Sequence, residues 1–235
     1  YGINLNVAPD KMSLDNFTFL FTGDHSYFTW FFNIVILTRI QVVLTLIISA
    51  TVAYGFAVYD FKFKNKLFVC VIIVMMVPFE MLVITNFQTV AKMGILNTLW
   101  VLFIPFTTSI FYTYILKNFF DTIPDSLYYS AKIDGASNWK YLWRVMIPIA
   151  SPSLFTIILL NTIASWNSYL WTQLTIFSDK YRTVPLGLAS FMTDAGSNPQ
   201  LQLSAAAVTV LPMIVLFLFF RKYIVNGVSR GGIKG

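Results

Sequence analysis

Five long apolar stretches constrain the fold of this chain more than any other feature of its sequence. They cover approximately residues 28–58, 67–91, 98–117, 149–175 and 203–223. A helix needs roughly 20 apolar residues to cross the hydrocarbon core of a bilayer, so each stretch is long enough to span it. None of them shows the apolar–polar alternation of a membrane β-barrel strand. We therefore expect an all-α polytopic membrane protein with five visible spans.

The composition agrees with a membrane protein. Only 11% of the residues are charged and 57% are hydrophobic, whereas a soluble domain carries roughly 25% charged residues. The single cysteine, Cys70, excludes an internal disulfide, and the single histidine, His25, excludes a histidine-cluster metal site. Prolines 78, 105, 152 and 212 lie in or at the ends of the spans, so we expect kinked helices.

Basic residues gather in the loops and the tail on one side of the predicted spans. Eleven of the sixteen lie there: Lys62, Lys64, Lys66, Lys117, Lys132, Lys140, Arg144, Arg221, Lys222, Arg230 and Lys234. Lysine and arginine in short loops mark the cytoplasmic side of a membrane. The net charge of +6 is therefore attributed to the orientation of the chain in the membrane and not to a nucleic-acid-binding surface.

The charge pattern predicts an external segment 1–27 and a transmembrane domain 28–224 that includes a cytoplasmic loop 118–148. A cytoplasmic tail, 225–235, would follow. An external start implies either an unusual N-out protein or a sixth helix upstream of Tyr1. Of these two we expect the sixth helix.

The polar loop between the third and fourth spans carries signals for two short helices. Pro124 and Asp125 favour a helix start, because proline is tolerated in a first turn and aspartate suits its positive end. Gly135 supplies the backbone freedom that ends this helix, and Ser137 can cap a second helix carrying Trp139. These features alone fit either an amphipathic helix at the membrane interface or a docking surface for a soluble partner.

The loop resembles the coupling loop of ABC-importer permeases. The signature of that family is Glu-Ala-Ala, three residues, Gly, nine residues and Ile-x-Leu-Pro. In this chain Tyr129-Ser130-Ala131, Gly135 and Val145-Met146-Ile147-Pro148 align with it. Tyr129 replaces the glutamate of the signature and Ile147 its leucine, which puts in doubt a polar contact but not the helix–turn–helix geometry.

Two further stretches resemble the carbohydrate-importer branch of the same family. Residues 165–171, followed by 182–188, are similar to its fifth-helix region. Residues 225–235 are similar to the C-terminus of the smaller maltose-type permease. The resemblance implies a type I ABC-importer transmembrane domain and a permease subunit of an ATP-driven carbohydrate importer in the bacterial cytoplasmic membrane.

The resemblance also implies partners and contact residues. The partners are a second homologous permease, two copies of an ATPase subunit and an external substrate-binding protein. The chain lacks a G-x-x-x-x-G-K-[ST] loop, so it is not expected to be an enzyme or to bind a cofactor, and ATP and magnesium would be held by the ATPase. The residues implied in ATPase contact are Tyr129, Ser130, Ala131, Asp134, Gly135, Ala136, Trp139 and Pro148 in the loop, and Gly231, Gly232 and Lys234 in the tail.

Aromatic and amide side chains near the end of the fourth span are candidates for a sugar path. They are Asn161, Trp166, Asn167 and Tyr169. Aromatic faces pack on the C–H surfaces of sugars, and amides hydrogen-bond their hydroxyls. The alternative is that the aromatic residues form an interfacial belt.

Two ionisable side chains fall within the predicted spans, where a charged side chain usually has a function. Arg39 lies in the first span and Glu80 in the second. Antiparallel neighbouring helices would bring them to a similar depth, which predicts an ion pair or a shared polar pocket; alternatively, Glu80 lines the translocation path.

Other transporter classes fit less well. An ion-coupled secondary transporter needs buried carboxylates and often has internal repeats, but Glu80 is the only acidic residue within a predicted span. A membrane enzyme is disfavoured by the scarcity of histidine, cysteine and intramembrane acids. A permease for a non-sugar, such as glycerol phosphate, remains an alternative, because the sequence does not identify the solute.

Overall fold

Helices make up all of the regular structure that is described for this chain. The structure is a computed structural model that describes residues 13–22, 26–193 and 199–231. The elements are α1 (Asp15–Thr22), α2 (Tyr27–Val58), α3 (Lys64–Met75), α4 (Phe79–Lys92), α5 (Trp100–Phe103), η2 (Ile104–Phe106), α6 (Ile110–Phe120), α7 (Asp125–Ile133), α8 (Asn138–Tyr141), η3 (Leu142–Met146), α9 (Ile147–Ile149), α10 (Ser151–Trp166), α11 (Leu170–Thr175), η4 (Asp179–Tyr181), α12 (Val184–Thr193) and α13 (Pro199–Gly231). The all-α expectation is confirmed for these residues.

Two single helices and three bent pairs of helices are long and apolar enough to cross a membrane. The single helices are α2 and the part Gln200–Phe220 of α13. The pairs α3–α4, α5–α6 and α8–α10 are bent by 91°, 43° and 81°. Counting each pair as one span gives up to five spans, as the sequence predicts.

The bends lie close to prolines, as expected. Pro78 has an extended backbone immediately before α4, and Pro105 lies within η2 before the α6 start. Pro152 occupies the first turn of α10, where a missing N–H costs little. The predicted end of the fourth span (149–175) was wrong: the helix ends at Trp166, and a separate helix, α11, follows.

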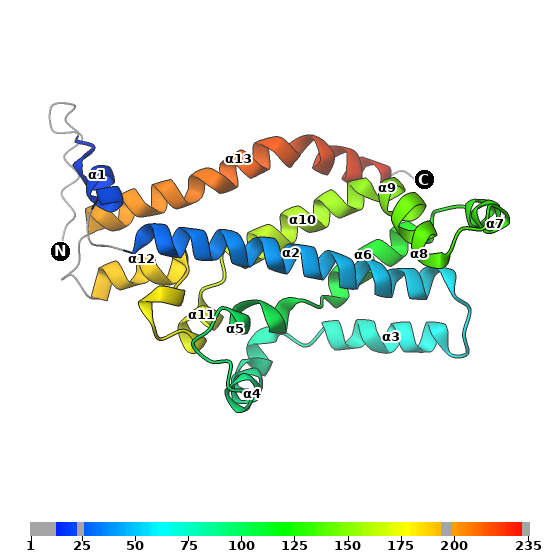
Figure 1. The fold of residues 1–235 in the computed structure, drawn as a ribbon, viewed down its shortest axis with the longest axis horizontal. Helices are drawn as coiled ribbons and strands as arrows, with labels where there is room; N and C mark the ends of the chain where they lie inside the picture. Colours follow the sequence, from blue (N-terminus) through cyan, green and yellow to red (C-terminus); the bar gives the residue numbers. More distant parts are fainter. Residues whose placement is uncertain (1–12, 23–25, 194–198, 232–235) are drawn as a thin grey trace.

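α2 is the central helix of the bundle. It packs against α6 and α10, and α10 packs against α13 (Figure 1). The largest apolar core joins α2, α6 and α10 with the second half of the polar loop: its buried members include Ala53, Leu116, Leu142, Met146 and Ile157. The polar loop is therefore anchored by the same core that holds the spanning helices together.

Buried polar side chains also join α2 to α10. The hydroxyl oxygens of Thr38 and Ser165 lie 3.1 Å apart, and the amide of Gln41 donates to Asn161 at 3.2 Å. Small hydroxyl and amide groups are common at helix contacts in membranes, where each bond contributes about 0.6 kcal/mol.

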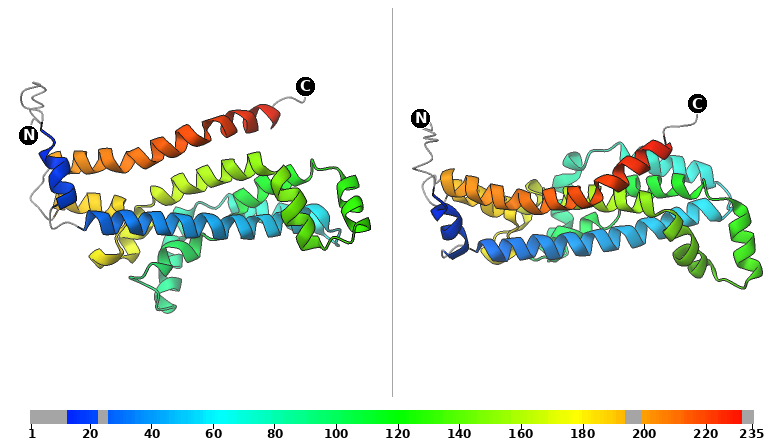
Figure 2. Two further views of the ribbon diagram at one scale, coloured as in Figure 1. Left: turned by 45° about the horizontal axis from the view of Figure 1, so that its top comes forward. Right: turned by 90° about the horizontal axis from the view of Figure 1, so that it is seen from above.

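The two ends of the bundle differ. α7 and α8 project from one end, together with the α2–α3 connection and the C-terminal end of α13, while α1 lies at the other end (Figures 1 and 2). The basic loops 62–66 and 117–144 are thus at the same end of the molecule, which agrees with the charge pattern.

Candidate coupling site

The first short helix of the polar loop begins where the sequence predicts. Pro124 has an extended backbone (ψ 134°) at the start of α7, and Asp125 occupies the first turn. The Lys117 ammonium lies 2.6 Å from the Asp121 carboxylate, which ties the end of α6 to the loop. The favourable position of Asp125 at the positive helix end helps α7 form outside the bundle.

The end of α7 is a Schellman motif built on Gly135. The Ala136 N–H donates to the Ala131 carbonyl at 2.8 Å and the Gly135 N–H to the Lys132 carbonyl at 3.0 Å. Gly135 has φ +72°, a left-handed conformation that costs other residues roughly 1–2 kcal/mol. A Cβ at this position would contact nothing within 4 Å, so the backbone conformation alone requires glycine.

The second short helix is capped by Ser137, as predicted. The Ser137 hydroxyl accepts the Lys140 N–H at 3.2 Å. The helix continues without a break from α8 through η3 to α9, and the Trp139 and Trp143 rings stack edge to face with centroids 5.4 Å apart. Pro148, the last residue of the polar loop, is exposed.

Asn138 fixes α7 relative to α8 and α2, and sequence reasoning missed it. Its side-chain oxygen accepts from the Tyr128 hydroxyl at 3.3 Å, and its amide donates to the Tyr59 hydroxyl at 2.7 Å. The Tyr128 ring also meets the Tyr141 ring edge to face at 5.2 Å. No local pattern marks such contacts, because Tyr59 lies 79 residues away along the chain.

The outer surface of this coupling segment, residues 121–148, is apolar as well as polar. No residue of α7 is buried, and Ile133 is 86% exposed, Tyr129 63% and Trp139 58%. Ser130, Asp134 and Gly135 are also exposed, and Ala131 and Ala136 are half-buried. Large exposed apolar side chains on a rigid projecting element are typical of a protein-binding surface.

The tail residues are only partly within the described structure. Gly231 is the last residue of α13, so the backbone of the predicted tail is helical from residue 225 to that point. Gly232 and Lys234 lie outside the described residues. The C-terminal end of α13 lies at the same end of the bundle as α7 (Figure 2).

The four candidates for a sugar path do not form one site. Asn161 is 2% exposed and bonded to Gln41, whereas the Asn167 amide bonds its own helix at the Ile163 carbonyl, 2.8 Å away. Trp166 and Asn167 line an apolar cavity of about 480 Å³ against α13, which does not include Asn161 or Tyr169. The sugar path therefore stays a prediction, and Asn161 has a structural partner.

We expect the Gln41–Asn161 bond to hold α2 and α10 together. Replacing either residue by alanine should lower the unfolding temperature of the detergent-purified protein. The free energy of unfolding lost in the double variant should be smaller than the sum of the losses in the two single variants, by about 0.6 kcal/mol. Additive losses, or a changed substrate KM in the Asn161 variant alone, would argue instead for a role of Asn161 in the sugar path.

The predicted Arg39–Glu80 pair is not formed within the described residues. The ion pairs there are Lys64–Asp60, Lys117–Asp121 and Arg182–Asp179, and Arg39 and Glu80 are both exposed. The 91° bend after α3 turns α4 away from an antiparallel course beside α2. Arg39 lines an apolar cavity of about 390 Å³ between α2, α10 and α13, and Glu80 does not line this cavity. The shared polar pocket stays a prediction.

Sequence comparison relates the chain to transport proteins. The sequence model of the "binding-protein-dependent transport system inner membrane component" family matches residues 45–230. The arabinooligosaccharides transport system permease protein AraQ of Bacillus subtilis is 37% identical, over 100% of this chain and 83% of the relative. The trehalose/maltose transport system permease protein MalG of Thermococcus litoralis is 31% identical, over 96% of this chain and 82% of the relative.

The fold is also found in a solved transporter. A chain from the crystal structure of a bacterial ABC transporter involved in the import of the acidic polysaccharide alginate superposes with a TM-score of 0.79, covering 91% of this chain and 80% of that one. At 22% identity this likeness concerns the fold alone. With the family match over residues 45–230 and relatives above 30% identity along almost the whole chain, the protein belongs to the family of binding-protein-dependent transport system inner membrane components.

Proposed function

We propose that this chain is a permease subunit of an ATP-driven carbohydrate importer and that its coupling segment docks on a separate ATPase subunit. The observation that carries the proposal is the rigid helix–turn–helix of residues 125–149, which projects from one end of the bundle with Ile133, Tyr129 and Trp139 exposed. The relatives named for arabinooligosaccharide and for trehalose and maltose transport support a sugar as solute. The gathering of basic residues at this end supports a cytoplasmic position for the segment.

Movement of the coupling segment would be transmitted to the spanning helices through two connections. One is the hydrogen bond from Asn138 to Tyr59, just after α2. The other is the continuous helix from α8 to α9, which leads into α10. An ATPase that binds one orientation of the segment better than another would shift the population of the permease between inward- and outward-facing states.

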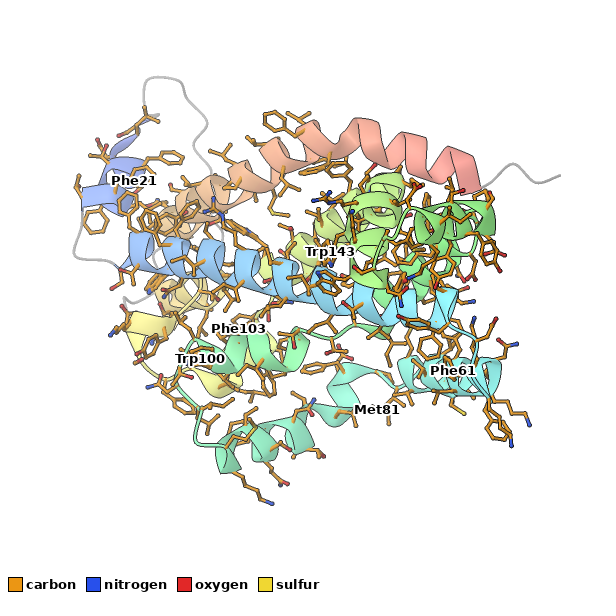
Figure 3. The ribbon with its side chains drawn as sticks, turned by 45° about the vertical axis from the view of Figure 1, so that its right-hand side comes forward. Phe21, Phe61, Met81, Trp100, Phe103 and Trp143 are labelled. Atoms are coloured by element: carbon orange, nitrogen blue, oxygen red, sulfur yellow. The ribbon has the colours of Figure 1, made fainter. Side chains whose placement is uncertain are left out.

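The surface of α3 and α4 supports a second permease subunit as partner. The break between these helices lies at Met76 and Val77, which are 77% and 45% exposed on this chain, and Met81 of α4 is 75% exposed (Figure 3). Irregular backbone at membrane depth is tolerated where protein covers it or where it lines a water-filled cavity. A homologous permease packed on this face would provide such a cover. An external binding protein would deliver the sugar, as the family description implies.

Solute uptake is expected to depend on ATP. The assay is sugar uptake by vesicles containing the permease pair and the ATPase, with binding protein outside and ATP inside, compared with a non-hydrolysable analogue. Uptake should require hydrolysable ATP and survive an ionophore that collapses ion gradients. Uptake that does not require ATP but stops with the ionophore would instead identify an ion-coupled transporter. Uptake of a polyol phosphate but of no sugar would show that the solute is not a carbohydrate.

A further inference from the structure

The connection between α2 and α3 carries a basic and aromatic patch, residues 60–66, to which the proposed function assigns no role. It contains three lysines within five residues, Lys62, Lys64 and Lys66. The rings of Phe61 and Phe63 in the same patch are 43% and 61% exposed, and Figure 3 shows Phe61 beside the beginning of α3. Most residues of the patch line an open cavity of about 640 Å³, so an external group can reach the lysines.

Two of the three lysines have no carboxylate partner among the described residues. The Lys64 ammonium lies 3.4 Å from the Asp60 carboxylate. The ammonium groups of Lys62 and Lys66 lie instead 5.3 and 5.5 Å from the centroid of the Phe63 ring. Such contacts between a cation and an aromatic face hold both charges beside the same ring. An anion with several acceptor oxygens, such as a phosphate, can therefore bind both ammonium groups at once.

An unusual backbone conformation directs the Phe63 ring outward. Phe63 has φ +67°, in the left-handed region that residues other than glycine rarely adopt. A strained backbone that exposes a phenyl ring to water has no local compensation. At the boundary of a membrane, by contrast, a phenylalanine ring is stabilised by entering the layer between headgroups and acyl chains. The position of this ring therefore fits the membrane boundary better than an aqueous surface.

The surface that continues from the basic patch along α3 is apolar. No residue of α3 is buried, and Leu67, Val69, Ile73 and Val74 are 49% to 59% exposed. A helix that is apolar on all sides suits a membrane and not water. The second permease is proposed as a cover for the break that follows α3, whereas the lysines precede and begin this helix. Acyl chains can thus lie along the first turns of α3 while a headgroup meets the lysines.

We propose that the basic patch binds the phosphate of an anionic phospholipid between Lys62 and Lys66. A lysine binds phosphate as a point charge on a flexible stem, so two lysines beside one ring can adapt to one headgroup. Basic clusters at the end of a spanning helix attract anionic lipids. The apolar surface of α3 favours a lipid over an acidic soluble protein as the source of the anion. This inference requires only the membrane location of the chain, and neither the identity of the solute nor the docking of an ATPase.

The test measures the affinity of the detergent-purified protein for anionic phosphatidylglycerol and for zwitterionic phosphatidylcholine by native mass spectrometry. The protein should bind phosphatidylglycerol more tightly. Lys62→Gln together with Lys66→Gln should weaken this binding about thirtyfold, roughly fivefold for each lysine, whereas arginine at both positions should retain it. The matched control is Lys92→Gln together with Lys180→Gln, which removes the same charge at two exposed lysines outside the patch; Lys180 also lies 5.3 Å from the centroid of the Tyr181 ring.

Several results would overturn the lipid site. Equal affinity for the two lipids, or an equal loss of affinity in the control variant, would show that these lysines form no specific anion site. Displacement of phosphatidylglycerol by inorganic phosphate, beyond the effect of chloride at the same ionic strength, would identify a site for free phosphate instead. Unchanged lipid affinity in the glutamine variant would also contradict the inference, and weaker binding of the purified ATPase to that variant would then assign the patch to a protein contact.

Discussion

Replacing Ile133 by aspartate or by lysine is expected to reduce ATPase docking at least tenfold and to abolish ATP-driven uptake. Ile133 is the most exposed large apolar side chain of the described part of the coupling segment, at 86%. Covering such a side chain contributes about 1.5–3 kcal/mol, and each 1.4 kcal/mol is a factor of ten in affinity. A charge placed there would in addition be buried in the complex without a partner.

The two substitutions at Ile133 test whether the contact is apolar. Equal losses with a negative and a positive charge are expected, measured by co-purification of the ATPase and by uptake into vesicles. Folding should be unchanged because the side chain contacts solvent in the free permease. The matched control is Leu14→Asp, since Leu14 is 73% exposed near α1, at the opposite end of the bundle. A loss with only one sign of charge would instead indicate an electrostatic contact.

Replacing Gly187 by alanine is expected to destabilise the end of the bundle that carries α1 and α12 by about 1–3 kcal/mol, the usual cost of overpacking a core. Gly187 lies in α12 against α2, and a Cβ there would overlap the ring of Trp30. Trp30 is 3% exposed and packs in a core with Ile34, Trp166 and Val184, so its ring has little room to move. The measurement is the unfolding temperature in detergent, with tryptophan fluorescence as a second readout.

Gly55→Ala provides the matched control for Gly187→Ala. Gly55 lies within α2, and a Cβ there meets no atom within 4 Å. Alanine is a better helix former than glycine, so this substitution should be neutral or stabilising by up to about 1 kcal/mol. If the two substitutions changed the unfolding temperature equally, the close approach of α12 to α2 would not restrict the size of the side chain at position 187.

The local features of the coupling segment could be predicted from the sequence because they depend on neighbouring residues only. Pro124 restricts its own backbone angle, Gly135 is needed for its own positive φ, and Ser137 caps a helix three residues ahead. The number of membrane spans is predictable for a similar reason, since apolar length is a property of a continuous segment.

The contacts between segments could not be predicted in this way. The expected Arg39–Glu80 pair assumed that the second span runs straight beside the first, but the bend near Pro78 redirects α4. Asn161, a candidate for the sugar path, accepts a hydrogen bond from Gln41, 120 residues earlier, and no local pattern predicts this contact. A cavity of about 380 Å³ beside α7 is lined by residues from position 57 to position 146, so no single stretch of sequence predicts it.

The sequence by itself determined the membrane location, the helical class, the approximate spans and the helix–turn–helix of the polar loop. Apolar length, proline and glycine act within one turn or one segment, and their effects hold wherever the segment lies in the fold. The tertiary structure alone decided that Asn138 ties α7 to Tyr59, that Tyr141 and Asp125 share a cavity, and that Gly187 must accommodate Trp30. These contacts depend on the angles at which separate helices cross, which result from packing the whole bundle at once.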